Sequence, residues 1–375
     1  MVDRRDPRIG PIVALAQSSE AVLTLTIDRT DPHSAAGVRR DLMALAGTLH
    51  ALEVDLERHG ERALDALIED AYAARYRAAY LPIDGSVVRR FSSDLRLPCG
   101  VRFAPQPALR PLVRALSLVP PIGLIAVASD EIRVVSATDR GLHRVVVVPA
   151  EPDSEDWREQ RARSRGQTIR GYQSSLQTEK FERRVGANHA RALRELSQHL
   201  PALAASHGWR GLVVLGDPRD TPVLTEWLSG ELPPVTFSPL IVEWLSESAE
   251  LARAVAAPLA EARRLSAESV LAAISEPSSH GRGVAIGSDA TVAVLSEERV
   301  AQLVVDDELS LVGWRAPDGR IALASVTLPG SDASLMVPEP DLVEAMVGKA
   351  FEQDATVTIL PAGTLPAGAA ALLRW

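Results

Sequence analysis

Hydrophobic and polar residues alternate over residues 22–27, where VLTLTI places threonine between aliphatic residues. A period of two predicts a strand, and the turn-forming pair Asp31-Pro32 ends it. The period then lengthens to four and three. Six aliphatic positions follow this longer spacing and form one helical stripe: Val38, Leu42, Leu45, Leu49, Leu52 and Leu56. The stripe predicts a helix with Gly60 as its C-terminal stop.

Two interpretations of this stripe are open. The same spacing occurs in coiled coils, so the helix could pair with a partner chain. About three repeats beside a predicted strand favour the other interpretation, a helix that packs on its own sheet. A second helix continues the pattern at Leu64, Leu67 and Ile68, and further strands are predicted at residues 76–82 and 101–103. Together these elements predict a first α/β domain of residues 1–118.

Three short hydrophobic runs separated by turn residues follow this domain, at residues 122–128, 132–137 and 142–148. Their spacing is that of an antiparallel meander. A strand with a continuous hydrophobic pattern at residues 212–215 is predicted to lie in the same sheet. The second domain is therefore predicted to be an α/β domain of residues 119–235 built on a mixed sheet.

Helical and strand patterns alternate through the remaining residues, 236–375. The predicted helices are residues 249–265, 267–274, 288–298 and 339–351, and the predicted strands are 300–305, 321–326, 356–360 and 371–375. Pro258 is expected to bend the first of these helices. The alternation predicts a three-layer sandwich around a mostly parallel or mixed sheet, so the fold class is α/β with three α/β domains.

Composition narrows the setting and the chemistry. Cys99 is the only cysteine among 375 residues, which excludes disulfides within the chain and clusters of cysteine ligands. This fits a reducing compartment, and the cytoplasm is expected. Cys99 itself is predicted to be a small buried hydrophobic residue. No hydrophobic run reaches the roughly 20 residues that span a bilayer. Neither a metal site nor a cofactor is predicted, since no histidine pair has ligand spacing and no glycine-rich nucleotide motif is present.

The charge of the chain is unevenly distributed. Residues 158–194 contain nine Arg and one Lys against three Glu, a local charge of +7 in a chain whose formal net charge is −9. The other residues therefore carry −16. Such a chain is not expected to coat nucleic acid indiscriminately, because that affinity sums over many phosphate contacts. Contact with a polyanion should be confined to the basic segment, residues 158–194.

The basic segment has two halves of different pattern. The first half, through Tyr172, lacks hydrophobic periodicity and contains two glycines, which predicts a loop. In the second half, five hydrophobic residues fall on one helical face: Phe181, Val185, Ala192, Leu196 and Leu200. Cations occupy the rest of this predicted helix and few Glu lie near them, which favours RNA contact over a face that is merely solvated.

The residues expected to contact RNA are the cations of both halves: Arg161, Arg163, Arg165, Arg170, Lys180, Arg183, Arg184, Arg191 and Arg194. A basic helix on structured RNA binds phosphates and shape more than base sequence. Binding should therefore weaken steeply as the salt concentration rises.

The order of these domains, with a basic loop and a long basic helix in the second, resembles the bacterial branch of the archaeo-eukaryotic peptide-chain release factor and Pelota superfamily. In its release factors, a loop that ends in Gly-Gly-Gln precedes an Arg-rich helix. Here Arg165-Gly166-Gln167 stands before the helix that contains Phe181 and Arg183. The resemblance covers most of residues 120–375 in layout.

The third predicted domain looks like the ribosomal-protein-like domain of the same superfamily. Residues 290–304 resemble its helix–strand element, and the closing residues 371–375, ALLRW, resemble its last strand. The resemblance therefore implies a ribosomal-protein-like α/β/α sandwich for residues 236–375.

Two departures limit what the resemblance implies. In active release factors, both glycines permit close approach to the peptidyl-tRNA ester, and the glutamine orients the attacking water. Only Gly166 and Gln167 match that motif, and Arg165 places a bulky cation at the first glycine. Stop-codon reading through an Asn-Ile-Lys-Ser motif is excluded, because the only Asn is Asn188 and neither of the two lysines lies beside it.

These observations predict a ribosome-associated translation factor of the hibernation or rescue type. It would bind ribosomal RNA through the basic loop and helix and would not read stop codons. Two alternatives stay open: a peptidyl-tRNA hydrolase that uses Gly166 and Gln167, and a protein-interaction scaffold without an RNA role. The ribosome is the expected partner, tRNA and a translation GTPase are candidate partners, and no membrane partner is expected.

Overall fold

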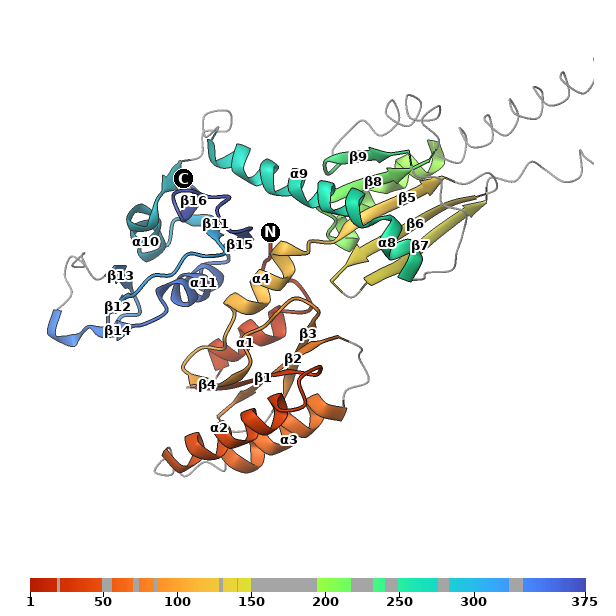
Figure 1. Ribbon diagram of the computed structural model, residues 1–375. Coiled ribbons are helices and arrows are strands. Elements are labelled where there is room, and N and C mark those ends of the chain that lie inside the picture. Colours follow the sequence, from red (N-terminus) through yellow and green to blue (C-terminus); the bar gives the residue numbers. More distant parts are fainter. Residues whose placement is uncertain are drawn as a thin grey trace, which may run out of the picture. The chain divides into compact units, whose positions relative to one another are not determined.

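The computed structural model describes residues 1–18, 21–48, 56–69, 74–83, 87–127, 131–139, 141–149, 194–216, 232–239, 249–275, 283–323 and 333–375. These residues form two compact units (Figure 1). Unit 1 contains Met1–Val119 and Ser269–Trp375, and unit 2 contains Pro120–Glu268. Both units combine helices with sheets, which confirms the α/β class. The division into domains of residues 1–118, 119–235 and 236–375 stays a prediction.

The first sheet of unit 1 has the strand order β3-β2-β1-β4, and all its pairs are antiparallel. Its strands are β1 (Val22–Asp28), β2 (Tyr76–Pro82), β3 (Arg89–Ser93) and β4 (Gly100–Ala104). The strands predicted at residues 22–27, 76–82 and 101–103 are confirmed. Strand β3, with the sequence RRFSS, escaped prediction because it lacks alternating hydrophobic residues.

Helices α2 (Ser34–Thr48) and α3 (Leu56–Glu69) lie together against one face of this sheet (Figure 1). The side chains of Val38, Leu42 and Leu64 are buried in a core with strand β1, so the stripe packs within its own chain as predicted. The prediction that Gly60 stops the helix is wrong, because Gly60 lies inside α3. A Cβ at this position would lie 2.5 Å from a methyl carbon of Leu42, so glycine permits α2 and α3 to approach closely.

The second sheet of unit 1 is mixed, with the order β10-β16-β11-β15 and one parallel pair, β11 with β15. Its strands are β10 (Val284–Ile286), β11 (Val300–Asp306), β15 (Thr356–Leu360) and β16 (Ala369–Leu373). Helices α10 (Ser288–Ser296) and α11 (Leu342–Glu352) pack against it. The predicted strands and the helix before β11 are confirmed.

A small antiparallel sheet, β13-β12-β14, precedes α11. It consists of β12 (Gly313–Arg315), β13 (Ile321–Leu323) and β14 (Val337–Glu339), and the short 3-10 helix η3 (Ala333–Leu335) leads into β14. The helix predicted over residues 339–351 therefore begins later than expected. Glu339 ends β14, and Asp341 caps α11 by accepting a hydrogen bond from the backbone N–H of Glu344 at 3.1 Å.

One hydrophobic core joins the two sequence segments of unit 1. It includes residues of α1 (Gly10–Ser18) and α4 (Arg110–Leu118), such as Ile12 and Leu112, together with Val343 and Phe351 from α11. The backbone of Val2 also pairs with β15 through two hydrogen bonds of 2.7 Å. The amino-terminal segment thus folds together with residues that follow it by more than two hundred positions.

Unit 2 contains a five-stranded sheet of order β7-β6-β5-β8-β9. Its strands are β5 (Ile122–Val127), β6 (Glu131–Thr138), β7 (Gly141–Pro149), β8 (Gly211–Leu215) and β9 (Val235–Ser238). Strands β5, β6 and β7 form the predicted antiparallel meander, and β8 runs parallel to both β5 and β9. The predicted mixed sheet is confirmed.

Helices lie against two separate hydrophobic layers of this sheet. A helix described over residues 194–207 buries Leu196 and Leu200, two of the five residues predicted for its apolar face, against one layer. Helices α8 (Ala249–Ala254) and α9 (Ala256–Ser275) contribute to the other layer. The helix predicted at residues 249–265 is divided between α8 and α9, and α9 continues without a break through the helix predicted at residues 267–274. Pro258 stands in the first turn of α9, where proline is tolerated.

The core of unit 2 makes a prediction at Gly123 in β5. A methyl group there would lie 2.5 Å from a ring carbon of Trp209 and 2.6 Å from a methyl carbon of Leu212. Trp209 is held in place, since its indole N–H donates to the Ser136 hydroxyl at 3.0 Å. Gly123→Ala should therefore destabilise unit 2 by about 1–3 kcal/mol, measured by urea unfolding followed by tryptophan fluorescence. Gly47→Ala, where no atom lies within 4 Å of the added methyl group, is the control and should not destabilise the protein.

Candidate functional site

Most of the residues predicted to contact RNA, together with Gly166 and Gln167, lie outside the described residues, and their roles stay predictions. Arg194 is the exception. It is exposed at the start of the helix described over residues 194–207, and its backbone carbonyl accepts a hydrogen bond from the Ser197 hydroxyl. In the described part of the chain, no three His, Cys, Asp or Glu side chains are grouped so that they could hold a metal ion. Nor is any described helix long and apolar enough to cross a membrane.

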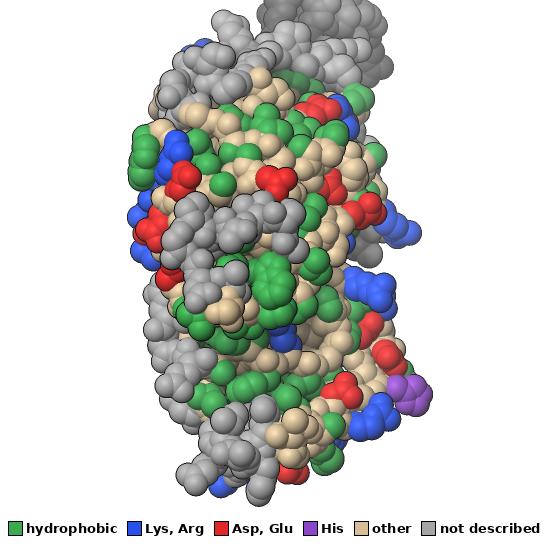
Figure 2. Space-filling model, turned by 90° about the vertical axis from the view of Figure 1, so that its left-hand side faces the viewer, with side chains coloured by type: hydrophobic (Ala, Val, Ile, Leu, Met, Phe, Trp, Pro, Cys, Tyr) green, Lys and Arg blue, Asp and Glu red, His purple; other side chains and the backbone are tan. Residues whose placement is uncertain are grey.

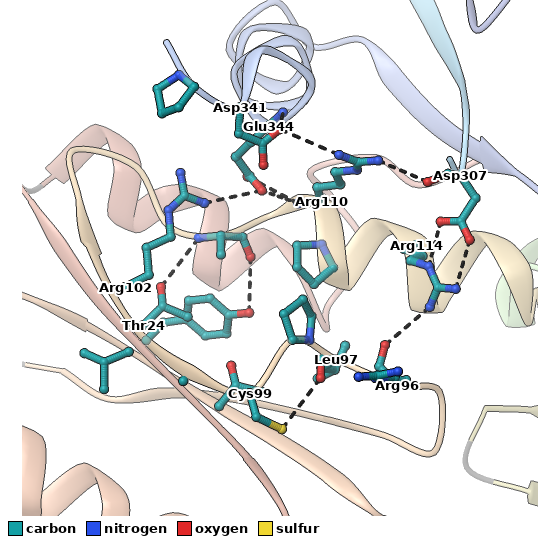
Figure 3. A pocket seen from close by; sticks show the side chains of 18 of the residues that line it. Thr24, Arg96, Leu97, Cys99, Arg102, Arg110, Arg114, Asp307, Asp341 and Glu344 are labelled. Atoms are coloured by element: carbon teal, nitrogen blue, oxygen red, sulfur yellow. Dashed lines mark hydrogen bonds and ion pairs between the residues drawn. The ribbon is translucent and has the colours of Figure 1, made fainter. Parts of the chain in front are cut away.

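The described residues form a different candidate site, a cavity of about 780 Å³ in unit 1 that the sequence did not predict (Figure 3). Strands β1 and β4, the loop before β4, and the N-terminal ends of α4 and α11 surround it. Four arginines line it: Arg96, Arg102, Arg110 and Arg114. Four carboxylates line it as well: Asp307, Glu339, Asp341 and Glu344.

The alternation along β1 creates one wall of this cavity. Leu23 and Leu25 point into the core under α2 and α3, so Thr24 and Thr26 face the other side of the sheet, where they line the cavity. Arg102 of β4 is the direct antiparallel partner of Thr24 and points to the same side. Because threonine and leucine alternate along β1, the threonines lie on one face of the strand and give the cavity a wall that bears hydroxyl groups.

Glu344 is the buried centre of the cavity wall opposite this sheet. Only 4% of the residue is exposed. Its carboxylate accepts hydrogen bonds from the backbone N–H groups of Leu109 at 2.6 Å and Arg110 at 3.2 Å. These two groups belong to the N-terminal end of α4, which has no cap from its own side chains. A residue of α11 thus supplies the negative charge that the N-terminus of α4 favours.

Burial raises the pKa of Glu344 to about 7, and the charge of Asp341 acts in the same direction. Arg102, whose guanidinium lies 3.5 Å from the Glu344 carboxylate, and the backbone hydrogen bonds act to lower this pKa but do not outweigh burial. Tyr80 also faces this carboxylate, and burial raises the pKa of its phenol well above the usual value. The phenol therefore stays protonated and donates to the carbonyl oxygen of Ala108 at 3.3 Å.

Two arginines of α4 fix the other end of the cavity. Arg114 makes a bidentate pair with Asp307 at 2.6 and 2.9 Å. Arg110, one turn earlier, donates to the carbonyl oxygens of Asp307 at 3.1 Å and Leu309 at 2.7 Å. Bidentate guanidinium–carboxylate pairs fix orientation as well as distance. Helix α4 is therefore held to the end of β11 from one side and to α11 from the other.

Little in the sequence marks this site as a site. The pattern Asp341-Leu342-Val343-Glu344 is that of a capping box, in which the glutamate would bind the backbone of its own helix. The structure instead directs the Glu344 carboxylate to α4, more than two hundred residues earlier in the chain. Spacing along the sequence cannot reveal such a pairing.

The prediction that Cys99 is buried is wrong. The residue is exposed at the mouth of the cavity, in the loop that enters β4. Pro98 and Gly100 flank it, and the strand begins only at Gly100, so the sheet does not cover the thiol.

The raised pKa of Glu344 predicts a pH-dependent stability. Between about pH 4.5 and pH 7 the folded protein holds a proton that the unfolded chain has released, so stability falls as pH rises through this window, by about 3 kcal/mol for a fully buried group. Glu344→Gln should abolish this component, because the amide does not titrate. Urea unfolding of both proteins from pH 5 to pH 8 measures it. Parallel stability profiles for the two proteins would contradict the prediction.

Comparison with known proteins identifies the central part of the chain. Residues 120–236 match the family model of bacterial archaeo-eukaryotic release factor family 5. Among curated proteins, none matches this chain.

Solved structures of a translation termination factor, of Pelota and of Dom34 also align with the chain. The archaeal translation termination factor aRF1 aligns over 100% of this chain and 99% of its own at 15% identity, with a TM-score of 0.24. Thermoplasma acidophilum Pelota aligns over 82% of each chain at 12% identity, with a TM-score of 0.25. S. cerevisiae Dom34, described as a translation termination-like factor, aligns over 100% of this chain and 93% of its own at 8% identity, with a TM-score of 0.34.

Alignments with such low TM-scores do not indicate function. The assignment of the central residues depends on the family match alone. That match covers the sheet of unit 2 from β5 to the start of β9 and includes all of residues 158–194, the basic segment. The match supports a place for residues 120–236 in the bacterial branch of the archaeo-eukaryotic release factor superfamily.

Proposed function

We propose that this protein is a ribosome-associated translation factor that binds ribosomal RNA through its basic segment, residues 158–194, as a hibernation or rescue factor rather than a reader of stop codons. One observation carries the proposal: the basic segment lies entirely within residues 120–236, the part of the chain that matches the release factor family. The segment holds a charge of +7, from nine Arg and one Lys against three Glu. No other stretch of the sequence combines such a charge with a family match.

Charge pairing in the described residues supports the same conclusion. Many arginines outside the basic segment have a carboxylate partner, as in Arg39–Glu61, Arg114–Asp307 and Arg264 with both Glu261 and Glu268. Figure 2 shows one face on which blue Lys or Arg side chains and red carboxylates lie interspersed. Three Glu cannot neutralise ten cations in the basic segment. An external polyanion such as RNA would supply the missing negative charge.

Two of the solved structures that align with this chain are described by what they bind or interact with. One solved structure is described as a model of ribosome-bound archaeal Pelota and ABCE1, and the Dom34 structure is described as interacting with Hbs1. The proposal extends ribosome association to this chain. It also includes tRNA and a translation GTPase as candidate partners.

Ribosome binding is tested by cosedimentation of the purified protein with ribosomes at increasing salt. The protein should pellet with ribosomes at low salt and be released steeply as salt rises, because phosphate contacts release counterions. Arg183→Glu with Arg184→Glu should reduce binding at least tenfold. The matched control, Arg89→Glu with Arg90→Glu, reverses the same number of charges at an adjacent exposed pair on β3 and should bind as the wild type does.

Two outcomes would overturn the proposal. Failure to cosediment at low salt would favour a protein-interaction scaffold without an RNA role. Equal loss of binding in the test pair and in the control pair would show that net charge alone, and not the basic segment, governs the association.

A second candidate function rests on Gly166-Gln167, which matches the last two residues of the Gly-Gly-Gln motif. Arg165 replaces the first glycine, whose lack of a side chain would allow close approach to the ester. We therefore expect no release of peptide from ribosome-bound peptidyl-tRNA above the uncatalysed rate. Release that disappears in Gln167→Ala and persists in Gln160→Ala, a neighbouring control, would instead establish a hydrolase.

A further inference from the structure

The carboxylates of the unit 1 cavity are largely satisfied by groups that the structure describes. Asp307 is held by Arg114 through two short bonds. Glu339 accepts bonds of 2.8 and 3.1 Å from Arg315, which is not a lining residue. Asp341 accepts the backbone N–H of Glu344 as the cap of α11. Little capacity to bind a further cation is left in the cavity.

Two of the lining arginines, in contrast, retain unused donors. Arg102 has one ion-pair partner among the described residues, Glu344, and that contact is long at 3.5 Å. Its side chain is 38% exposed. The hydrogen bond between Arg96 and Arg114 uses the backbone of Arg96, whose carbonyl oxygen accepts from the Arg114 guanidinium at 3.3 Å. It therefore occupies none of the N–H donors of the Arg96 side chain. Figure 3 shows Arg102 beside Thr24 and Arg96 near Arg114. The cavity therefore has surplus capacity for an anion.

The remaining lining narrows the chemical class of the ligand. A cavity of about 780 Å³ exceeds a bare inorganic anion and falls in the range of small-molecule sites. Tyr80 is the only aromatic residue among the described lining residues. It is buried with its hydroxyl bonded to Ala108, so none of these residues offers an exposed ring to stack on a nucleobase. Hydroxyl groups of Thr24 and Thr26 instead suit a polar, hydroxylated ligand.

We propose that this cavity binds a small organic phosphate without a nucleobase, such as a sugar phosphate, with Arg102 as the principal phosphate-binding residue and Thr24 beside it. The guanidinium of Arg102 presents several N–H donors in a plane, which matches the oxygens of a phosphate. The cavity lies in unit 1 and shares no residue with the basic segment, residues 158–194. The proposal is therefore independent of ribosome binding.

The ligand would compete with Glu344 for Arg102. The charged or titratable groups that face Glu344 are Arg102 from β4, Tyr80 from β2 and Asp341 at the start of α11, whereas Arg110 of α4 contacts it through the backbone N–H. Protonation of Glu344 near neutral pH removes the competing negative charge and leaves Arg102 for the ligand. Binding should therefore tighten as pH falls from 8 to 6.

The test is isothermal titration calorimetry on the full chain, with sulfate and ribose 5-phosphate as probes. Ribose 5-phosphate should bind more tightly than sulfate, because it also reaches the threonine hydroxyls. Arg102→Gln should weaken both by about tenfold or more. Arg39→Gln is the matched control: its side chain is 40% exposed, it lies outside the cavity, and its removal should leave the affinity unchanged.

The pH arm uses sulfate, whose charge does not change between pH 6 and pH 8. Sulfate should bind the wild type severalfold more tightly at pH 6 than at pH 8. Glu344→Gln, which cannot ionise, should bind at pH 8 about as tightly as the wild type does at pH 6. An affinity that is independent of pH in the wild type would contradict competition by Glu344.

Three results would overturn the assignment. The first is no binding of either probe to the wild type, and the second is equal affinity in Arg102→Gln and Arg39→Gln. The third is Arg102-dependent binding of a hexauridylate that ribose 5-phosphate fails to displace, which would assign the cavity to RNA phosphate. If Arg102→Gln is misfolded by circular dichroism, Thr24→Val decides, since it keeps every charge: severalfold weaker ribose 5-phosphate binding supports the site, and unchanged binding rejects it.

Discussion

The hydrophobic core of unit 1 is the constraint on which the rest of that unit depends. It draws on both ends of the chain, with Ile12 and Leu112 from the first segment and Val343 and Phe351 from the last. Neither segment covers this surface alone, because the buried side chains of α4 and α11 belong to one cluster. Burying a side chain of this size contributes about 1.5–3 kcal/mol. The sheet formed by β1 to β4 is therefore stabilised by residues of α11, which follow it by more than two hundred positions in the sequence.

Packing two segments around one core brings polar groups together as well. The N-terminal end of α4 approaches α11, and its unpaired N–H groups require an acceptor. Glu344 supplies this acceptor at the cost of burying a carboxylate, which raises its pKa to about 7. The Arg114–Asp307 pair holds the same helix one turn further along. The cavity lies between these two attachments, so its charged lining is a consequence of how the segments are joined.

Local pattern predicted much of the secondary structure, and long-range packing explains what it missed. The alternation in β1 predicted a strand, although residues on both of its faces are buried, and the stripe of Val38 and Leu42 predicted the core-facing side of α2. Gly60 was misjudged because its role, close approach to Leu42, depends on a contact between helices. The cavity was missed for the same reason. Its arginines and carboxylates are dispersed along the sequence, and only the fold brings them together.

The same principle distinguishes the cavity from the basic segment. In unit 1, folding pairs Arg114 and Arg315 with carboxylates and leaves Arg102 with a single long contact, so unused guanidinium donors, rather than a net positive charge, line the cavity. In the basic segment, residues 158–194, the excess of positive charge is present in the sequence itself, because three Glu cannot offset ten cations. A contiguous excess of this size suits an extended polyanion, because its binding energy grows with the number of phosphates contacted. The two proposed ligands therefore differ in size as the cations differ in distribution: one guanidinium with a long contact for a small phosphate, and ten cations within residues 158–194 for RNA.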